Sequence, residues 1–318
     1  DIRDLVQGIQ ELGCKVSGQM GHCGAFSKNH TLDGRPKGPR GGLNLLGFAE
    51  GMWFCDAMKL SDIESLVNAY GEAAKFMKSV GFDALEIHFG HGYGLCQFLS
   101  PLTNNRKDNY GGSVENRLRL PLRVLAAVRE AVGDDFPIIG KISMSEGRRG
   151  GIRLEDSIDI CRALDKAGID AIITSSGTST MNPMLMFRGD SILPSLLRYE
   201  KNRFMRLILR LMGRKMFPAM PFHDMYLLEH AKRIRKAVKC KMIYIGGAVS
   251  GENFKHILDV GFDFIQLGRS LLADPDLPTK LAEKPGYTSR CNHCNQCVGT
   301  IASPLGIHCP QFFDGARS

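Results

Sequence analysis

The chain has 318 residues, of which 43% are hydrophobic and 23% are charged. This balance is typical of a folded globular protein, and it excludes a disordered chain, a collagen-like chain and a small disulfide-stapled scaffold. No apolar stretch approaches the ~18 residues of a membrane-spanning helix, so no integral membrane segment is expected. Lys and Arg exceed Asp and Glu by 41 to 33, and the net charge of +8 raises nucleic acids and anionic membrane surfaces as partners.

Helices and strands are expected to alternate along the chain. Apolar residues at i, i+3, i+4 and i+7 predict a first helix over residues 2–12, which Gly13 ends. Later helical patterns, the first with Ser61 as its N-cap, alternate with short, nearly continuous apolar segments. This alternation predicts an α/β fold with a parallel sheet covered on both faces. Strands are expected at residues 15–20, 83–88, 136–143, 170–175, 241–245 and 262–267, and helices at residues 61–80, 113–132, 155–167, 223–238 and 252–260.

Two glycine-containing turns favour a (β/α)8 TIM barrel over a doubly wound sheet. Gly246-Gly247 and Gly268-Arg269 follow the last two expected strands, and barrel enzymes often build a phosphate site after strands 7 and 8. Counting back makes the first expected strand number 3, so the first two strands are expected to be absent from this chain. No G-x-G-x-x-G turn opens a helix, so no separate dinucleotide domain is predicted. The predicted domains are a barrel at residues 1–284, with a helical insertion at 182–222, and a Cys-rich tail at 285–318.

The densest reactive cluster lies at the end of the strand expected at residues 83–88. His88, His91 and Tyr93 stand there among glycines, and the carboxyl ends of barrel strands face the active site. Two imidazoles could hold a carbonyl oxygen and stabilise charge that develops on it, and Tyr93 could supply a proton. Two alternatives stay open. One histidine is a packed core residue and Tyr93 only caps the loop, or the two histidines bind a metal.

A long run of residues around this cluster forms a specific signature. It comprises His88-Phe89-Gly90-His91-Gly92-Tyr93, Gln97-Phe98-Leu99-Ser100-Pro101, Asn105-Arg106, Asp108, Tyr110-Gly111-Gly112-Ser113 and Glu115-Asn116-Arg117. In these residues the chain resembles the Old Yellow Enzyme family, whose members are FMN-dependent (β/α)8-barrel ene-reductases. The resemblance covers roughly residues 1–283.

The resemblance implies roles for individual residues. His88 and His91 match the pair that binds the carbonyl oxygen of an enone, and Tyr93 matches the proton donor. Gln19 matches the glutamine that hydrogen-bonds the pyrimidine edge of the flavin, and Lys141 stands where many members have an arginine beside the flavin. Glycine amides approach a phosphate closely and an arginine can clamp it. The residues that match the FMN phosphate site are Gly246, Gly247, Gly268 and Arg269.

The implied function is the reduction of an activated C=C bond of an α,β-unsaturated carbonyl compound, with FMN as cofactor and NAD(P)H as reductant. The expected partner is a small-molecule enone or enoyl substrate, without nucleic acid, and a homo-oligomer is left open. Two alternatives stay open. One is a non-catalytic or truncated flavin or iron–sulfur electron-transfer protein, and the other is amine oxidation as in the trimethylamine dehydrogenase branch.

Four of the ten cysteines crowd into the tail. A C-x2-C-x2-C run with a more distant fourth cysteine suits a [4Fe–4S] cluster, and it resembles the family branch that contains 2,4-dienoyl-CoA reductase. Zinc and an unmetallated tail are the alternatives. A metal site implies a reducing compartment, so a cytoplasmic location is expected. The four cysteines are Cys291, Cys294, Cys297 and Cys309.

The insertion holds most of the excess charge. Residues 196–215 carry seven Arg and Lys side chains against Glu200 alone, which gives +7 − 1 = +6 of the total of +8. Apolar residues are interleaved with the basic ones, as in a basic amphipathic helix that lies on an anionic membrane surface. We favour the commoner interpretation, a helix or lid beside the barrel with a solvated charged face.

Overall fold

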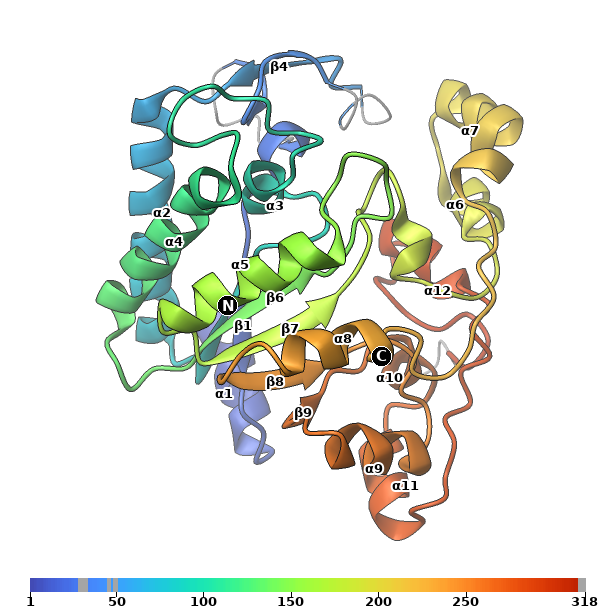
Figure 1. Ribbon diagram of the computed structural model, residues 1–318. Coiled ribbons are helices and arrows are strands. Elements are labelled where there is room, and N and C mark those ends of the chain that lie inside the picture. Colours follow the sequence, from blue (N-terminus) through green and yellow to red (C-terminus); the bar gives the residue numbers. More distant parts are fainter. Residues whose placement is uncertain (28–33, 45–46, 48–50, 314–318) are drawn as a thin grey trace. The chain divides into compact units, whose positions relative to one another are not determined.

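The computed structural model describes residues 1–27, 34–44, 47 and 51–313 (Figure 1). The last residues of the predicted tail, 314–318, lie outside this range. The chain divides into two compact units, which are described separately. Unit 1 comprises Asp1–Ser176 and Arg233–Met242, and unit 2 comprises Gly177–Lys232 and Ile243–Ser318. The predicted division at residue 284 stays a prediction.

Unit 1 is built on four parallel strands in the order β1 (Ser17–Met20), β5 (Ala84–His88), β6 (Ile138–Ser143) and β7 (Ala171–Ser175). Successive strands are joined through helices, as parallel strands require. The helices α2, α4 and α5 lie side by side along this sheet (Figure 1). The helices of unit 1 are α1 (Ile2–Glu11), α2 (Leu60–Val80), α3 (Gly94–Leu99), α4 (Val114–Val132), α5 (Leu154–Lys166) and the short 3-10 helix η1 (Gly24–Phe26).

The two faces of this sheet differ in chemistry. Leu85, Ile87 and Ile138 are fully buried on one face. Because successive side chains point to opposite faces, the residues between them share the other face, and the strand register aligns them in rows. The sequence predicted apolar residues on both faces of the sheet, but this second face carries polar residues among its apolar ones. Its polar residues are Gln19, Glu86, His88, Lys141, Ser143 and Ser175.

The expected helices and strands of unit 1 are present with small shifts at their ends. The predicted N-cap at Ser61 is wrong, because α2 begins at Leu60 and its N-cap residue is Lys59. The reason is Asp62, whose carboxylate accepts the Lys59 backbone N–H at 2.7 Å and so caps the helix from inside its first turn. Ser113 is the N-cap of α4, and its hydroxyl accepts the Asn116 N–H.

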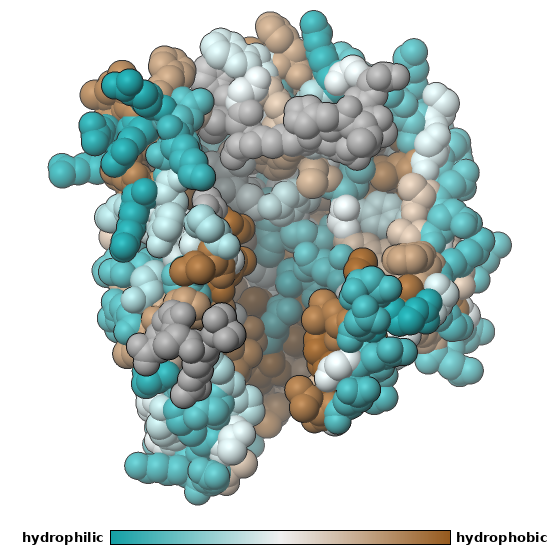
Figure 2. All heavy atoms as spheres, turned by 180° about the vertical axis from the view of Figure 1, so that it is seen from behind, coloured by the Kyte–Doolittle hydropathy of each residue, from teal (hydrophilic) through white to brown (hydrophobic). Residues whose placement is uncertain are grey.

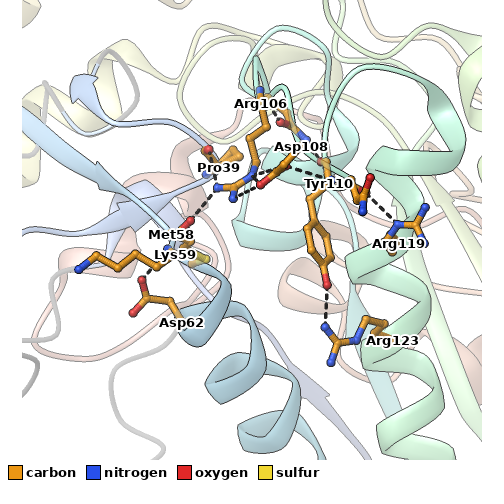
Figure 3. A network of polar contacts seen from close by, with 11 residues as sticks. Pro39, Met58, Lys59, Asp62, Arg106, Asp108, Tyr110, Arg119 and Arg123 are labelled. Atoms are coloured by element: carbon orange, nitrogen blue, oxygen red, sulfur yellow. Dashed lines mark hydrogen bonds and ion pairs between the residues drawn. The ribbon is translucent and has the colours of Figure 1, made fainter.

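A small second sheet in unit 1 was not predicted. It consists of β2 (Lys37–Gly38), β4 (Phe54–Ala57) and β3 (Gly42–Leu43), with β4 in the middle. Arg106 of the family signature reaches this region and donates to the Met58 carbonyl oxygen at 2.7 Å. Arg106 also pairs with Asp108, which accepts the Tyr110 N–H at 3.1 Å, and the Tyr110 hydroxyl accepts from Arg123 at 2.7 Å (Figure 3). This part of the signature therefore ties α4 to the segment before α2.

Unit 2 contains the end of β8 (Lys241–Tyr244) paired in parallel with β9 (Phe264–Ile265). The helix predicted at residues 223–238 is shorter, because Met225 has a left-handed backbone and α8 (Leu228–Arg235) begins only after it. No helix within the described residues combines the length and the apolar character that crossing a bilayer requires. The other helices of unit 2 are η3 (Pro183–Leu185), α6 (Leu193–Tyr199), α7 (Arg203–Met216), α9 (Gly251–Asp259), α10 (Arg269–Ala273), α11 (Leu277–Glu283), α12 (Gln296–Gly299) and η4 (Thr300–Ala302).

The basic insertion forms two helices where the sequence predicted one amphipathic helix over residues 196–215. α6 ends at Tyr199 because Glu200 takes an extended backbone. α7 then starts with a cap of its own, since the Asn202 side chain accepts the backbone N–H groups of Phe204 and Met205 at 2.9 and 3.1 Å.

Candidate active site

A buried ion pair lies on the polar face of the unit 1 sheet. Lys141 Nζ is 2.8 Å from Glu86 Oε1, and the two side chains are only 12% and 9% exposed. The Gln19 side-chain amide donates to the same Glu86 oxygen. Gln19 and Glu86 are register partners in neighbouring strands, and Lys141 follows in the next strand. The predicted residues Gln19 and Lys141 are therefore brought together through Glu86.

The two predicted histidines continue this row. His88 Nε2 is 2.9 Å from His91 Nδ1, and His91 Nε2 is 2.7 Å from the Ser175 hydroxyl. The backbone N–H of His91 donates to Ser143 Oγ at 2.8 Å, with a left-handed backbone at His91. The side chains of His88, His91 and Ser175 thus form one hydrogen-bonded chain from the end of β5 to the end of β7, and Ser143 of β6 holds the backbone of His91.

Both imidazoles are held in the neutral form. Burial lowers the pKa of His88 to about 4, and the nearby Lys141 charge adds to the effect. Burial likewise lowers the pKa of His91 to about 3, with further contributions from His88 and Lys141. A neutral imidazole has one donor and one acceptor nitrogen. The tautomer of His91 therefore sets the tautomer of His88.

Tyr93 completes the predicted trio. It is the N-cap residue of α3, and its ring centroid lies 5.0 Å from that of His88 and 5.9 Å from that of Phe26. His88 and Tyr93 therefore lie side by side at the end of β5. The sequence leads us to expect that His88 and His91 hold one ligand oxygen together, but in this structure the two rings hydrogen-bond each other. Because His88 Nε2 and His91 Nδ1 are hydrogen-bonded to each other, one of the two rings has to turn before both can hydrogen-bond the same ligand oxygen.

Gln97, to which the sequence assigned no role, holds in place the turn between His88 and Tyr93. Its side chain is fully buried. Gln97 Oε1 accepts the Ala25 N–H at 3.0 Å, and Nε2 donates to the Gly92 carbonyl oxygen at 2.9 Å. A Cβ at Gly24 would lie 2.4 Å from Gln97 Oε1. The only sequence signal for this role was the place of Gln97 in the signature.

In unit 2, the four predicted phosphate-site residues line one pocket. The pocket has a volume of about 120 Å³ and includes Gly246, Gly247, Gly268 and Arg269 in its walls. The backbone is left-handed at Gly247, where a Cβ would lie 2.8 Å from a ring carbon of Tyr226. Two further wall atoms, Gln266 Oε1 and His293 Nε2, are buried without a hydrogen-bond partner in the described structure. Unpaired buried polar atoms are costly, so they indicate a polar ligand at this pocket.

Arg269 connects this pocket to the Cys-rich tail. Its guanidinium donates to the Arg188 carbonyl oxygen at 2.8 Å and to the Asn295 side-chain oxygen. Asn295, which is buried with a left-handed backbone, donates in turn to the carbonyl oxygens of Phe187 and Asp190 at 2.6 and 2.7 Å. The tail is therefore anchored in the wall of the pocket by one amide side chain.

The predicted metal ligands are close together but are not arranged around a common point. Burial raises the pKa of Cys291, and it raises that of Cys297 to about 11, with smaller contributions from Cys294 and Cys309. Within residues 1–27, 34–44, 47 and 51–313, no three His, Cys, Asp or Glu side chains are placed to hold a metal ion. Four thiols are chemically suited to a cluster or to zinc. The arrangement in this structure would have to close up to ligate either.

The comparisons with known proteins agree with this architecture. Residues 1–184 match the model of the NADH:flavin oxidoreductase / NADH oxidase family. The chain is 33% identical to 4,4'-dithiodibutanoate disulfide reductase of Rhodococcus erythropolis, over 94% of this chain and 73% of that protein. It is 30% identical to NADH oxidase of Thermoanaerobacter brockii, over 96% of this chain but 42% of that protein.

Solved structures show the same fold. A complex of 2-naphthoyl-CoA reductase aligns with a TM-score of 0.77 and 24% identity, over 96% of this chain and 43% of that one. Morphinone reductase aligns with a TM-score of 0.63 and 21% identity, over 92% of this chain and 72% of that one. The predicted α/β barrel fold is confirmed.

The protein is thus an oxidoreductase of the NAD(P)H:flavin class on an α/β barrel fold. The chain belongs to the NADH:flavin oxidoreductase / NADH oxidase family, which confirms the resemblance to Old Yellow Enzyme. It spans less than half the length of several of its relatives.

Proposed function

We propose that this chain is the catalytic part of an FMN-dependent reductase that uses NAD(P)H to reduce the C=C bond of an α,β-unsaturated carbonyl compound. The observation that carries the proposal is the pairing of a neutral His88 with Tyr93, with ring centroids 5.0 Å apart at the end of β5. Such a pair offers one hydrogen-bond donor for a carbonyl oxygen and one hydroxyl proton for a carbon. The substrate class is a small enone or enoyl compound.

The residues present suit FMN. In unit 1, Gln19 and Lys141 would bind the pyrimidine edge of the flavin, where an amide and a cation match its carbonyl and N–H groups. In unit 2, taken by itself, the pocket lined by Gly246, Gly247, Gly268 and Arg269 has unpaired polar atoms in its wall and suits a phosphate group such as the one that FMN carries. FMN, when bound, supplies the two-electron hydride chemistry that links NAD(P)H to the C=C bond.

The hydrogen-bonded chain of His88, His91 and Ser175 determines whether His88 can donate a hydrogen bond to the substrate. If the Ser175 hydroxyl donates to His91 Nε2, then His91 donates from Nδ1 to His88 Nε2, and His88 carries its proton on Nδ1. With this arrangement of protons, the Nδ1–H of His88 can donate a hydrogen bond to the carbonyl oxygen of the substrate. In the reverse order that nitrogen is an acceptor and repels the carbonyl oxygen. His91 and Ser175 are therefore proposed as positioning residues that select the donor tautomer.

The reaction is tested by an anaerobic titration of the purified chain supplemented with FMN. We expect a flavin spectrum that NADPH or NADH bleaches, and we expect 2-cyclohexenone to restore it. A chain that takes up no FMN would reject the flavoenzyme. A chain whose bleached flavin is restored by dioxygen but not by enones would reject ene-reduction and keep the family assignment.

We further propose that Cys291, Cys294, Cys297 and Cys309 bind a [4Fe–4S] cluster. The support is the C-x2-C-x2-C spacing with a more distant fourth cysteine, which suits such a cluster. Anaerobically purified protein is expected to hold about four iron and four sulfide per chain. Cys294→Ser is expected to lose them, and Cys14→Ser, at an exposed cysteine of unit 1, is expected to keep them. One zinc per chain, or no metal at all, would contradict the cluster.

A further inference from the structure

Helix α7 leaves a row of large apolar side chains in solvent. Phe204, Leu207 and Leu211 are 65%, 52% and 76% exposed. They are spaced at i, i+3 and i+7 and therefore form one row along the helix. Single exposed apolar residues are common on protein surfaces, but a contiguous row marks a surface that contacts another apolar phase.

A row of arginines runs beside this apolar row. Arg203, Arg206 and Arg210 each precede a member of the apolar row by one position. Arg214 continues their row one turn further along the helix, and all four arginines are exposed. No acidic residue occurs between Arg203 and Met216. Figure 2 shows brown apolar and teal polar spheres side by side at the upper left, where α7 lies after the half turn from Figure 1.

The remaining side of α7 is used for packing. Leu209 and Gly213 are buried. A Cβ at Gly213 would lie 2.3 Å from Leu193 of α6, so the two helices approach closely at that point. α7 is therefore anchored along one side, and its apolar and arginine rows are left for an external contact.

We propose that α7 is a docking surface for an anionic lipid bilayer. An apolar row flanked by basic side chains is the pattern of helices that lie in the membrane interface, with the apolar side chains among the acyl chains and the cations at the anionic headgroups. A second copy of the chain explains the apolar row only, because a symmetric contact would bring the two arginine rows together. A nucleic acid explains the arginines only. The proposal is independent of the proposed reaction.

Vesicle co-sedimentation of the full chain tests the proposal. We expect binding to vesicles of phosphatidylcholine with phosphatidylglycerol, weakening as salt rises, and little binding to phosphatidylcholine alone. A basic residue near an anionic surface contributes roughly a fivefold factor in affinity, so the triple variant R206Q/R210Q/R214Q is expected to bind about 100-fold more weakly. Each of Leu207→Gln and Leu211→Gln is expected to weaken binding roughly tenfold.

Matched controls change similar side chains elsewhere. K75Q/R162Q/K255Q removes three exposed cations outside α7, and Leu258→Gln removes an exposed leucine of α9. Neither is expected to change vesicle binding. All substituted residues are exposed, so unchanged thermal unfolding is expected and is measured for each variant.

The depth to which α7 enters the bilayer gives a second readout. Trp53 is the single tryptophan of the chain, so Phe204→Trp in a Trp53→Phe background reports on the apolar row alone. Its emission is expected to shift to the blue with anionic vesicles and to be quenched by brominated lipid. Absence of vesicle binding, or equal binding by the α7 variants and the controls, would overturn the proposal. Self-association that the leucine variants abolish, without vesicle binding, would assign the row to a second copy instead.

Discussion

Replacement of Tyr93 by Phe is expected to slow the reoxidation of reduced flavin by an enone by roughly 100- to 10,000-fold, the range for loss of a positioned proton donor. The substitution keeps the ring that packs between His88 and Phe26 and removes only the hydroxyl. Reduction of the flavin by NAD(P)H needs no proton from this residue, so its rate is expected to stay unchanged. Stopped-flow absorbance of the two half-reactions measures both effects in one protein.

Tyr110→Phe provides the matched control. It removes a tyrosine hydroxyl that accepts from Arg123. This contact belongs to the network of Arg106, Asp108, Tyr110 and Arg123, which we call the staple (Figure 3). Both half-reactions are expected to proceed at the original rate in this variant. If Tyr93→Phe is reoxidised by enones as fast as the unchanged protein, another group donates the proton and the role of Tyr93 is rejected.

The second large effect is expected on stability. Glu146 is fully buried, and its carboxylate accepts from the Ser100 hydroxyl at 2.6 Å and from the Ile152 N–H at 2.8 Å. Burial raises the pKa of Glu146, and the hydrogen bonds that its carboxylate accepts and the charge of the buried Arg117 offset part of that rise in pKa. Glu146→Ala leaves both donors without an acceptor, and each buried unsatisfied group costs about 1–3 kcal/mol.

A total loss of about 3 kcal/mol corresponds to a fall of roughly 6–12 °C in the thermal unfolding midpoint. Glu146→Gln keeps an acceptor oxygen and the side-chain volume, so its midpoint is expected to fall by less than half as much. Differential scanning calorimetry of the two variants with equal flavin content makes the comparison. Equal midpoints for Glu146→Ala and the unchanged protein would show that the donors find other acceptors.

Much of unit 1 could be predicted because its signals are local. The alternation of apolar segments and helical patterns located β5, β6 and β7, and Ser113 located the start of α4. The cluster of His88, His91 and Tyr93 was visible because its members are neighbours in the chain. Local signals of this kind depend on spacing and residue type alone.

The partners of these residues could not be predicted because they come from distant strands. His91 meets Ser175 only because the register of β6 and β7 places Ser143 opposite Ser175. Glu86 joins Gln19 to Lys141 for the same reason. The break between α6 and α7 was missed because the amphipathic period continues across Glu200, while the backbone there turns to an extended conformation.

The staple of Arg106, Asp108, Tyr110 and Arg123 affects how sequences with this signature can be classified. These residues hold α4 and the segment before α2 in place. A search pattern built on them therefore detects a scaffold and carries no information about the reaction. A relative could keep the whole staple after losing His88 or Tyr93 and would still be collected as a reductase. Under the proposed function, activity within this group is therefore assigned from His88 and Tyr93 themselves, and the surrounding motif is considered separately.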